Sequence, residues 1–323
     1  MLRASYELPW DGVPVDLGGS NNLNLHLPSD DGGDVARIYA PWTSPERLEA
    51  IQRARQALTD AGLPFAHTMT ARDGGTWIGC EDRVIEVERY VAGDSMDIDG
   101  GLRDGMTVLG RIHTVLSEVD AGIAGRAAPF PNHVDPEHAL VWTRAGTATI
   151  RAREPTSEER RAADLADVLA AELRDSELGL ARVVPRQLVH GDFWDNNVLF
   201  RDGEIVVILD LDFMGERARI DDVALTLYYT NSTLGDGFGS SERIALLASL
   251  VDAYDRGLDQ KLSGTERAAL PYALARTVLC FVGMIPSIDD RARARRLVRE
   301  ITADLEWSLD VVRTPERWQS AFA

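Results

Sequence analysis

Residues 188–213 constrain the fold of this chain more than any other segment. Two short runs, 198–200 and 204–209, are rich in β-branched and apolar residues, and an Arg-Asp-Gly turn at 201–203 separates them. This pattern predicts a β-hairpin, because aspartate followed by glycine favours the tight turn that joins antiparallel strands. The residues that flank the two strands therefore emerge together at the open end of the hairpin.

Four polar residues are expected to meet at this open end. Asn197 precedes the first strand, Asp210 follows the second, Asp212 comes just after it, and Asp192 lies on the loop that enters the same end. Crowded carboxylates repel one another unless a cation or a reacting proton compensates them. Oxygen ligands of this kind suit Mg²⁺. Phosphoryl transfer uses the same set, with one aspartate as base and an asparagine and a second aspartate on the metal.

Strands dominate the first part of the chain and helices the rest. Apolar periodicity and turn signals predict strands at residues 13–17, 23–27, 34–39, 76–80 and 84–90. A helix is expected over residues 44–61, because Ser44 suits an N-cap and Pro45 the first helical position. Further helices are expected from residue 102 onward, including one over 158–173, with a Gly-rich break at 235–240. Segregated strands and helices indicate an α+β fold, which we divide into residues 1–91 and 92–323.

The acidic balance of the chain limits its partners. The net charge is −18, from 52 acidic and 34 basic residues, which argues against nucleic acid or an anionic membrane surface as a partner. It mildly favours a cationic substrate, although surplus acid also serves solubility. We find no run of the roughly 20 apolar residues that a membrane span needs and no signal-peptide core, so we expect a cytoplasmic protein. Cys80 and Cys280 match no metal-ligand spacing and are expected to be buried free thiols.

The motifs around the hairpin resemble a known family. His-Gly-Asp at 190–192, Asn197, Asp-Leu-Asp at 210–212 and Asp-Val-Ala at 222–224 are similar to the aminoglycoside phosphotransferase/choline kinase family. The resemblance covers most of the chain. It includes a nucleotide loop at 18–22, an ATP-contacting strand at 35–37, a hinge at 89–93 and a helix motif at 109–113. The His-Gly-Asp triplet replaces the His-Arg-Asp of protein kinases, and their Asp-Phe-Gly triplet does not occur.

This resemblance implies a bilobal protein-kinase-like fold, with a small β-rich N-lobe, a large helical C-lobe and ATP or GTP between them. It implies Asp192 as catalytic base, Asn197 and Asp210 as Mg²⁺ ligands, and Asp212 as an accessory ligand. The implied nucleotide contacts are Arg37 at the phosphates, Ser20, Asn21 and Asn22 in the loop, and the backbone of Tyr90 and Val91 at the hinge.

The phosphate-binding cation must be an arginine, since Lys261 is the only lysine. An arginine fork still binds phosphate, with a different reach from lysine. Family members commonly pair this cation with a helix glutamate, and here Glu46 and Glu49 are both candidates.

Several other polar residues are expected to serve structure. His190 is expected to fix its loop through backbone hydrogen bonds, and His113 to be a satisfied core histidine. Asp221 and Asp222 precede an apolar run, which favours N-capping of the next helix. Trp194 and Asp195 either border the acceptor site or only pack the loop. Exposed charge is the expected role of three further acidic residues, which otherwise line a cleft for a cation: Asp236, Asp289 and Asp290.

The sequence leaves the acceptor open. One hypothesis is an antibiotic O-phosphotransferase acting on an aminoglycoside or another hydroxylated natural product, such as a peptide or nucleoside antibiotic. Its rival is a metabolic kinase of homoserine, choline or sugar type, because residues 192–200 resemble the homoserine-kinase variant of the family, whose loop also ends in Asn-Val-Leu-Phe. A third hypothesis is an inactive nucleotide-binding regulator, which the intact Asp192, Asn197 and Asp210 disfavour.

Overall fold

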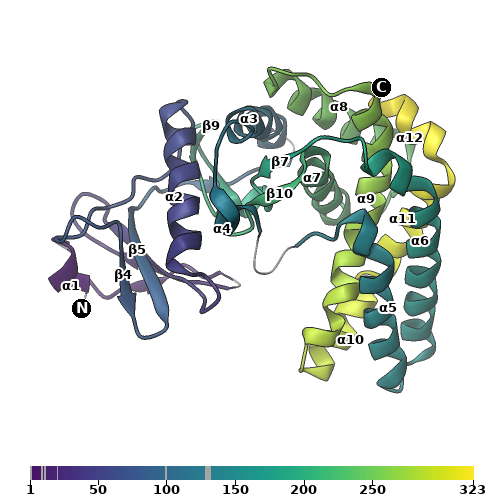
Figure 1. Ribbon diagram of the computed structural model, residues 1–323, viewed down its shortest axis with the longest axis horizontal. Coiled ribbons are helices and arrows are strands. Elements are labelled where there is room, and N and C mark those ends of the chain that lie inside the picture. Colours follow the sequence, from purple (N-terminus) through teal and green to yellow (C-terminus); the bar gives the residue numbers. More distant parts are fainter. Residues whose placement is uncertain (1, 9, 11, 20, 99, 128–131) are drawn as a thin grey trace.

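An antiparallel sheet forms the N-terminal lobe (Figure 1). The computed structural model of the chain describes residues 2–8, 10, 12–19, 21–98, 100–127 and 132–323. The strand order is β1-β2-β3-β5-β4. All five predicted strands are present, with ends shifted by at most two residues: β1 (Val15–Asp16), β2 (Leu23–Leu27), β3 (Asp34–Ile38), β4 (Trp77–Cys80) and β5 (Arg83–Arg89). The short helix α1 (Leu2–Ser5) precedes them.

The sheet buries a small core of its own. Leu27, Ala36 and Val87 are almost completely buried beside Tyr6. They alternate with residues of the other face, as expected for strands with one buried side. The register places Arg37 directly opposite Glu86. The face of the sheet opposite this core therefore carries two charged side chains, Arg37 and Glu86.

Helix α2 (Pro45–Asp60) connects the two lobes. The Ser44 hydroxyl accepts the N–H of Arg47 at 3.2 Å, and the helix ends before Gly62, whose φ is +77°. Both ends therefore form as predicted. Leu48 packs with Tyr39 of the sheet, whereas the positions on the neighbouring stripe belong to the large C-terminal core: Ile51, Ala54 and Leu58. Two apolar stripes on one helix thus connect two cores.

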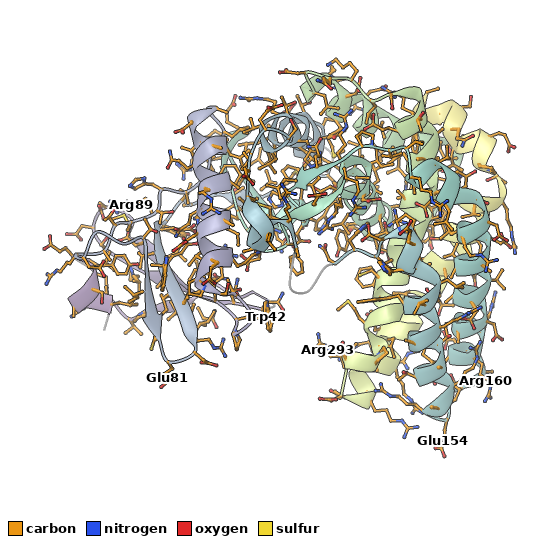
Figure 2. All side chains as sticks on the ribbon, viewed as in Figure 1. Trp42, Glu81, Arg89, Glu154, Arg160 and Arg293 are labelled. Carbon is orange, nitrogen blue, oxygen red and sulfur yellow. The ribbon has the colours of Figure 1, made fainter. Side chains whose placement is uncertain are left out.

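The larger lobe is mostly helical (Figure 1). Its helices are α3 (Gly101–Leu116), α4 (Gly122–Arg126), α5 (Pro136–Ala152), α6 (Ser157–Ala181), α7 (Arg219–Thr233), α8 (Ser241–Gly257), α9 (Gly264–Met284), α10 (Arg291–Glu300), α11 (Thr302–Arg313) and α12 (Pro315–Phe322), with 3₁₀ turns η1 (Asp195–Asn197) and η2 (Ile285–Ser287). Helix α6 runs eight residues beyond its predicted end. Figure 2 shows labelled charges such as Glu154, Arg160 and Arg293 on the outside of this lobe. The lobe boundary at residues 91 and 92 stays a prediction.

Helix α9 corrects one expectation from the sequence. The segment Gly264–Ser287 is long and apolar enough to cross a membrane by length and composition, contrary to our reading that no such run exists. In the fold 72% of its most apolar window is buried inside the protein. Helices α5, α6, α7, α11 and α12 contact it. The apolar run is therefore accounted for as the central core helix of this lobe.

Two small sheets accompany the five-stranded sheet. The predicted hairpin is β8 (Val198–Arg201) and β9 (Glu204–Ile208), extended by β6 (Asp94–Ser95). Its turn residues Asp202 and Gly203 have φ of +54° and +81°, the left-handed values that a tight hairpin turn requires. Strands β7 (Arg186–Val189) and β10 (Gly215–Ala218) pair antiparallel beside it. The Ile208 N–H donates to the Pro64 carbonyl at 2.7 Å, which fixes the hairpin to the N-lobe.

Candidate active site

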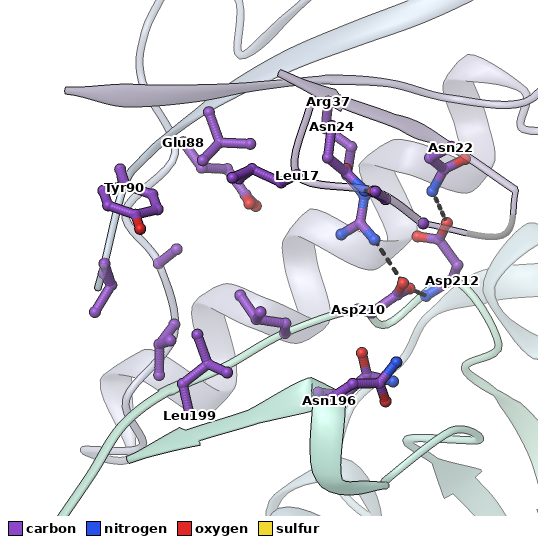
Figure 3. A pocket seen from close by; sticks show the side chains of 18 of the residues that line it. Leu17, Asn22, Asn24, Arg37, Glu88, Tyr90, Asn196, Leu199, Asp210 and Asp212 are labelled. Atoms are coloured by element: carbon purple, nitrogen blue, oxygen red, sulfur yellow. Dashed lines mark hydrogen bonds and ion pairs between the residues drawn. The ribbon is translucent and has the colours of Figure 1, made fainter. Parts of the chain in front are cut away.

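A cavity of about 290 Å³ lies between the N-terminal sheet and the hairpin (Figure 3). Every predicted site residue that the structure describes lines it: Asn21, Asn22, Arg37, Tyr90, Val91, Asp192, Asn197, Asp210 and Asp212. Ser20 lies outside the described residues. In Figure 3 Tyr90 and Leu199 lie toward one end of the cavity and Asp210 and Asp212 toward the other. One end of the cavity thus offers Tyr90 and Leu199 to a base, with Glu88 nearby, and the other end holds Arg37 among carboxylates, where phosphates and a cation fit.

The predicted base, Asp192, is held in a defined orientation. The Asn197 amide nitrogen, Nδ2, donates to the Asp192 backbone carbonyl at 2.8 Å and to Asp192 Oδ2 at 3.1 Å. Gly191 precedes it with φ of +88°, and a side chain there would clash with the Phe213 carbonyl. Burial and then the neighbouring Asp210 raise the pKa of Asp192 to about 7. A carboxylate with this pKa is suited to accept a proton near neutral pH.

Asp222 holds the loop that carries Asp192 through its contact with Gly191, and the sequence did not reveal this role. It is completely buried, and both of its oxygens accept the Gly191 N–H at 3.1 Å. His113 Nε2 lies 2.9 Å from Asp222 Oδ2, and His113 Nδ1 lies 2.8 Å from the Tyr254 hydroxyl. The predicted N-capping role of Asp222 was wrong, because the N-cap of α7 is Ala218. The core role predicted for His113 is confirmed.

Asp221, the other predicted cap, also lies inside the first turn of α7 and instead pairs with Arg276 at 2.6 Å. His190 behaves as expected from the sequence. Its Nε2 lies 3.1 Å from the Leu209 carbonyl, and its Nδ1 accepts the Asp192 N–H at 3.3 Å. His190 therefore shapes the loop that carries Asp192, whereas Asp221 belongs to a buried ion pair.

The residues at the charged end fit a divalent cation. Asp210 has a left-handed φ of +62°, and its Oδ1 accepts the Asp212 N–H at 3.1 Å. Asp212 Oδ1 is buried without a hydrogen-bond partner, and burial and then Asp210 raise the pKa of Asp212 to about 7. Because Asn197 Nδ2 faces Asp192, its Oδ1 remains for a ligand role.

Among the described residues, no group of three or more His, Cys, Asp and Glu side chains forms a ready-made metal cage. The set at the charged end, two carboxylates and an amide, instead suits Mg²⁺, which keeps several waters and binds substrate phosphates.

Arg37 pairs with Asp210 and not with a glutamate of the helix. Its Nη2 lies 2.6 Å from Asp210 Oδ2, and Figure 3 shows the two side chains pointing toward each other. Glu46 and Glu49 are exposed on α2, so neither candidate for this pair was right. We expected α2 to provide a glutamate for Arg37, whereas in the fold α2 contributes an arginine.

That cation is Arg55, which lies between two buried glutamates of β5. It bonds both oxygens of Glu86, at 3.0 and 2.8 Å, and it pairs with Glu88. Glu86 also accepts hydrogen bonds from Tyr39 and Gln52. These contacts fix α2 to the strand next to Arg37 and so position the charged end of the cavity.

The loop and hinge residues are also held by the fold. Asn22 Nδ2 donates to Asp212 Oδ2, and Asn22 Oδ1 accepts the Ala40 N–H at 3.0 Å. At the hinge the Tyr90 N–H already donates to the Gly33 carbonyl at 3.0 Å. Of the two predicted hinge residues, the Tyr90 carbonyl and the Val91 backbone therefore remain to meet a base.

The chain is similar to known proteins in its sequence and in its fold. The sequence profile described as the phosphotransferase enzyme family matches residues 13–269. Curated relatives include homoserine kinases from Phenylobacterium zucineum (strain HLK1), 31% identical over 84% of this chain and 78% of the relative, and from Rhodopseudomonas palustris (strain ATCC BAA-98 / CGA009), 33% identical over 82% and 75%.

Similar solved structures include two kinases of small molecules. One is a microcompartment-associated aminopropanol kinase, with a TM-score of 0.67, 18% identity and coverage of 99% of this chain and 96% of that chain. Another is the amicoumacin kinase hAmiN in complex with AMP-PNP and Ca²⁺, with a TM-score of 0.66, 17% identity and coverage of 93% and 90%. At these identities the structures establish the bilobal kinase-like fold.

Proposed function

The chain belongs to the phosphotransferase enzyme family, and we propose that it moves the γ-phosphoryl group of ATP or GTP onto a hydroxyl of a small molecule. One observation carries this proposal. A buried aspartate, oriented by an asparagine amide, lines the same cavity as an arginine and two further carboxylates. Phosphoryl transfer needs these parts and little covalent chemistry from the protein.

Each side chain then has a defined task. Asp192 orients the acceptor hydroxyl and takes its proton as the oxygen attacks the γ-phosphorus. The bond from that phosphorus to the leaving nucleoside diphosphate breaks, and the Arg37 guanidinium offsets charge on the phosphate oxygens. Asn197, Asp210 and Asp212 would hold Mg²⁺, which when bound neutralises the triphosphate. Burial of the site strengthens these interactions over their strength in water.

The acceptor we propose is a hydroxylated amine. The similar proteins include homoserine kinases, an aminopropanol kinase and a choline/ethanolamine kinase family protein, and the compounds in these names carry a hydroxyl two or three carbons away from a nitrogen. The net charge of −18 also favours a cationic acceptor such as an amine. Two sizes of acceptor remain, and different observations favour each.

A larger acceptor, such as a hydroxylated natural product, is favoured by a second cavity. This cavity of about 470 Å³ lies between α5 and α9 and begins at His133, next to Asn132, which contacts Asp192. Its walls are mostly apolar, and Val141 is 69% exposed there. Such a surface suits the body of an amphipathic compound. A small amino alcohol such as homoserine is favoured instead by the sequence relatives.

A nucleotide-consumption assay with Mg·ATP and Mg·GTP tests the proposal. L-homoserine, 1-amino-2-propanol and spectinomycin serve as acceptors, and we expect consumption that depends on one of them and on Mg²⁺. The phosphorylated product, identified by mass spectrometry, shows which size of acceptor is correct. Tight nucleotide binding without turnover of any acceptor in a wider panel of alcohols would favour the regulator hypothesis instead.

A further inference from the structure

A second amide contacts the proposed base from the opposite side. Asn132 comes just before α5, and its Nδ2 donates to Asp192 Oδ1 at 2.9 Å. Asn197 Nδ2 donates to the other oxygen, Oδ2, at 3.1 Å. Each oxygen of one carboxylate thus receives an amide N–H group, which fixes both the position and the plane of the carboxylate. Nothing in the sequence motifs pointed to Asn132, because it lies 60 residues from Asp192.

Arg217 determines the orientation of the Asn132 amide, that is, which side its oxygen and its nitrogen face. Its Nη1 approaches Asn132 Oδ1 at 3.4 Å, and its Nη2 donates to the Phe213 carbonyl at 3.0 Å. A guanidinium only donates hydrogen bonds, so it selects the amide oxygen and leaves the amide NH₂ for Asp192. Arg217 is 4% exposed, and the carboxylates that act on its charge, Asp222, Asp221 and Asp135, lie beyond the distance of a direct ion pair. Its guanidinium is therefore free to donate to the Asn132 amide oxygen and the Phe213 carbonyl.

The segment that carries Asn132 is fixed by buried charges. Arg276 donates to the Val134 carbonyl and also pairs with Asp221 at 2.6 Å and with Glu177 at 3.0 Å. Asp135 also pairs with Arg186 at 2.8 Å, where both side chains are partly exposed. The backbone two residues after Asn132 is therefore held by a buried arginine, and Asn132 itself contacts both Asp192 and Arg217. A side chain supported in this way can orient its neighbour.

We propose that Asn132 is a positioning residue for the general base, with Arg217 fixing its amide. The proposal rests on the proposed function, in which Asp192 takes the acceptor proton. A carboxylate oxygen accepts two hydrogen bonds, so Asn132 occupies one site on Oδ1 and leaves the other for the acceptor hydroxyl. The acceptor thereby meets a carboxylate whose plane the two amides have already fixed. Small errors in such alignment lower the rate of the chemical step and leave nucleotide binding intact.

Three variants test this inference: Asn132→Ala, Arg217→Met and the double variant. The assay measures turnover of Mg·ATP with L-homoserine and with spectinomycin, and phosphate release with water as acceptor. For Asn132→Ala we expect kcat to fall about 10- to 100-fold in the reactions that the wild type catalyses, with the nucleotide KM changed by less than about threefold. Arg217→Met should lower kcat in the wild-type background and add almost nothing to Asn132→Ala, because it acts through the same amide.

Three results would overturn the inference: a kcat within about twofold of wild type, a loss confined to an acceptor KM, or additive effects of the two substitutions. Asn132→Gln keeps an amide on a longer side chain. A kcat above that of Asn132→Ala therefore distinguishes a positioning role of the amide from a role in packing. Melting temperatures show whether each variant is folded. Asp192→Asn, assayed in parallel, separates the two claims. Turnover that persists in this variant contradicts the proposed function, whereas its loss there with normal turnover in Asn132→Ala contradicts only the positioning role.

Discussion

Asp222 holds the loop that presents the proposed base, although it lines no part of the cavity between the sheet and the hairpin. Replacing it by alanine would leave the Gly191 N–H and His113 without their buried partner. An unsatisfied buried donor costs about 1–3 kcal/mol, so we expect Asp222→Ala to lower the free energy of unfolding by about 2–4 kcal/mol in urea titrations. Asp222→Asn keeps an oxygen for Gly191 and should lose less than half of that. Equal losses in both variants would contradict this role.

At the scale of single residues the sequence predicted the local part of the site. Asp192, Asn197, Asp210 and Asp212 flank one hairpin, so their spacing was enough to bring them into one cavity. Asn132 and Asp222 reach the same loop through tertiary contacts, and no local pattern marks them. The partner of Arg37 was also missed, because the pair joins β3 to the end of the hairpin.

Helix α2 presents an arginine where a glutamate was expected, and this has a consequence for stability. Arg55 neutralises Glu86, which is fully buried, and Glu88. Removing one partner of a buried ion pair costs about 3–5 kcal/mol, so Arg55→Met should lower the free energy of unfolding by about that amount. Glu49→Gln on the exposed face of the same helix should change it by less than about 0.5 kcal/mol. Urea unfolding measures both variants. Comparable decreases in the free energy of unfolding would contradict a stabilising role for the pairs of Arg55 with Glu86 and Glu88.

Helices α5 and α9 approach each other so closely that one contact position requires glycine. A Cβ added at Gly146 would lie 2.0 Å from the Val282 carbonyl oxygen. Forcing the helices apart costs about 1–3 kcal/mol, so Gly146→Ala should lower the melting temperature. Gly179→Ala is the matched control, because Gly179 is exposed on α6 with nothing near the added methyl group. That variant should be neutral or stabilised by up to about 1 kcal/mol. A melting temperature of Gly146→Ala equal to that of the wild type would contradict the close approach of α5 and α9.

At the scale of elements, local signals worked where they were strong. The hairpin, the strands of the N-lobe and both ends of α2 follow from turn residues, alternation and capping. The apolar run of α9 was overlooked although the sequence contains it, whereas its role as a core helix follows only from the helices that surround it in the fold. One thiol was also misplaced, since Cys280 is buried but Cys80 is partly exposed.

Over the whole molecule, buried charges make stability depend on pH. Glu177 is buried against Arg276, and burial raises its pKa to about 7. A carboxyl group whose folded pKa lies above its unfolded value binds its proton more tightly when folded, so its contribution is full below about pH 4.5 and is lost as the pH rises through about 7. Glu177→Gln should therefore become more stable relative to wild type between pH 5 and pH 8, by up to about 3 kcal/mol. A constant difference across that range, in urea titrations, would contradict it.

The central claim is that two lobes bring a nucleotide and an oriented carboxylate, Asp192, to one point. The direct test compares transfer of labelled γ-phosphate by wild type, Asp192→Asn and Asp289→Asn, with nucleotide binding measured by calorimetry. Asp289 is an exposed carboxylate and serves as the matched control. We predict that Asp192→Asn loses at least about 100-fold in transfer and keeps its nucleotide Kd within about threefold, whereas Asp289→Asn matches wild type. Transfer by Asp192→Asn at close to the wild-type rate would contradict the account.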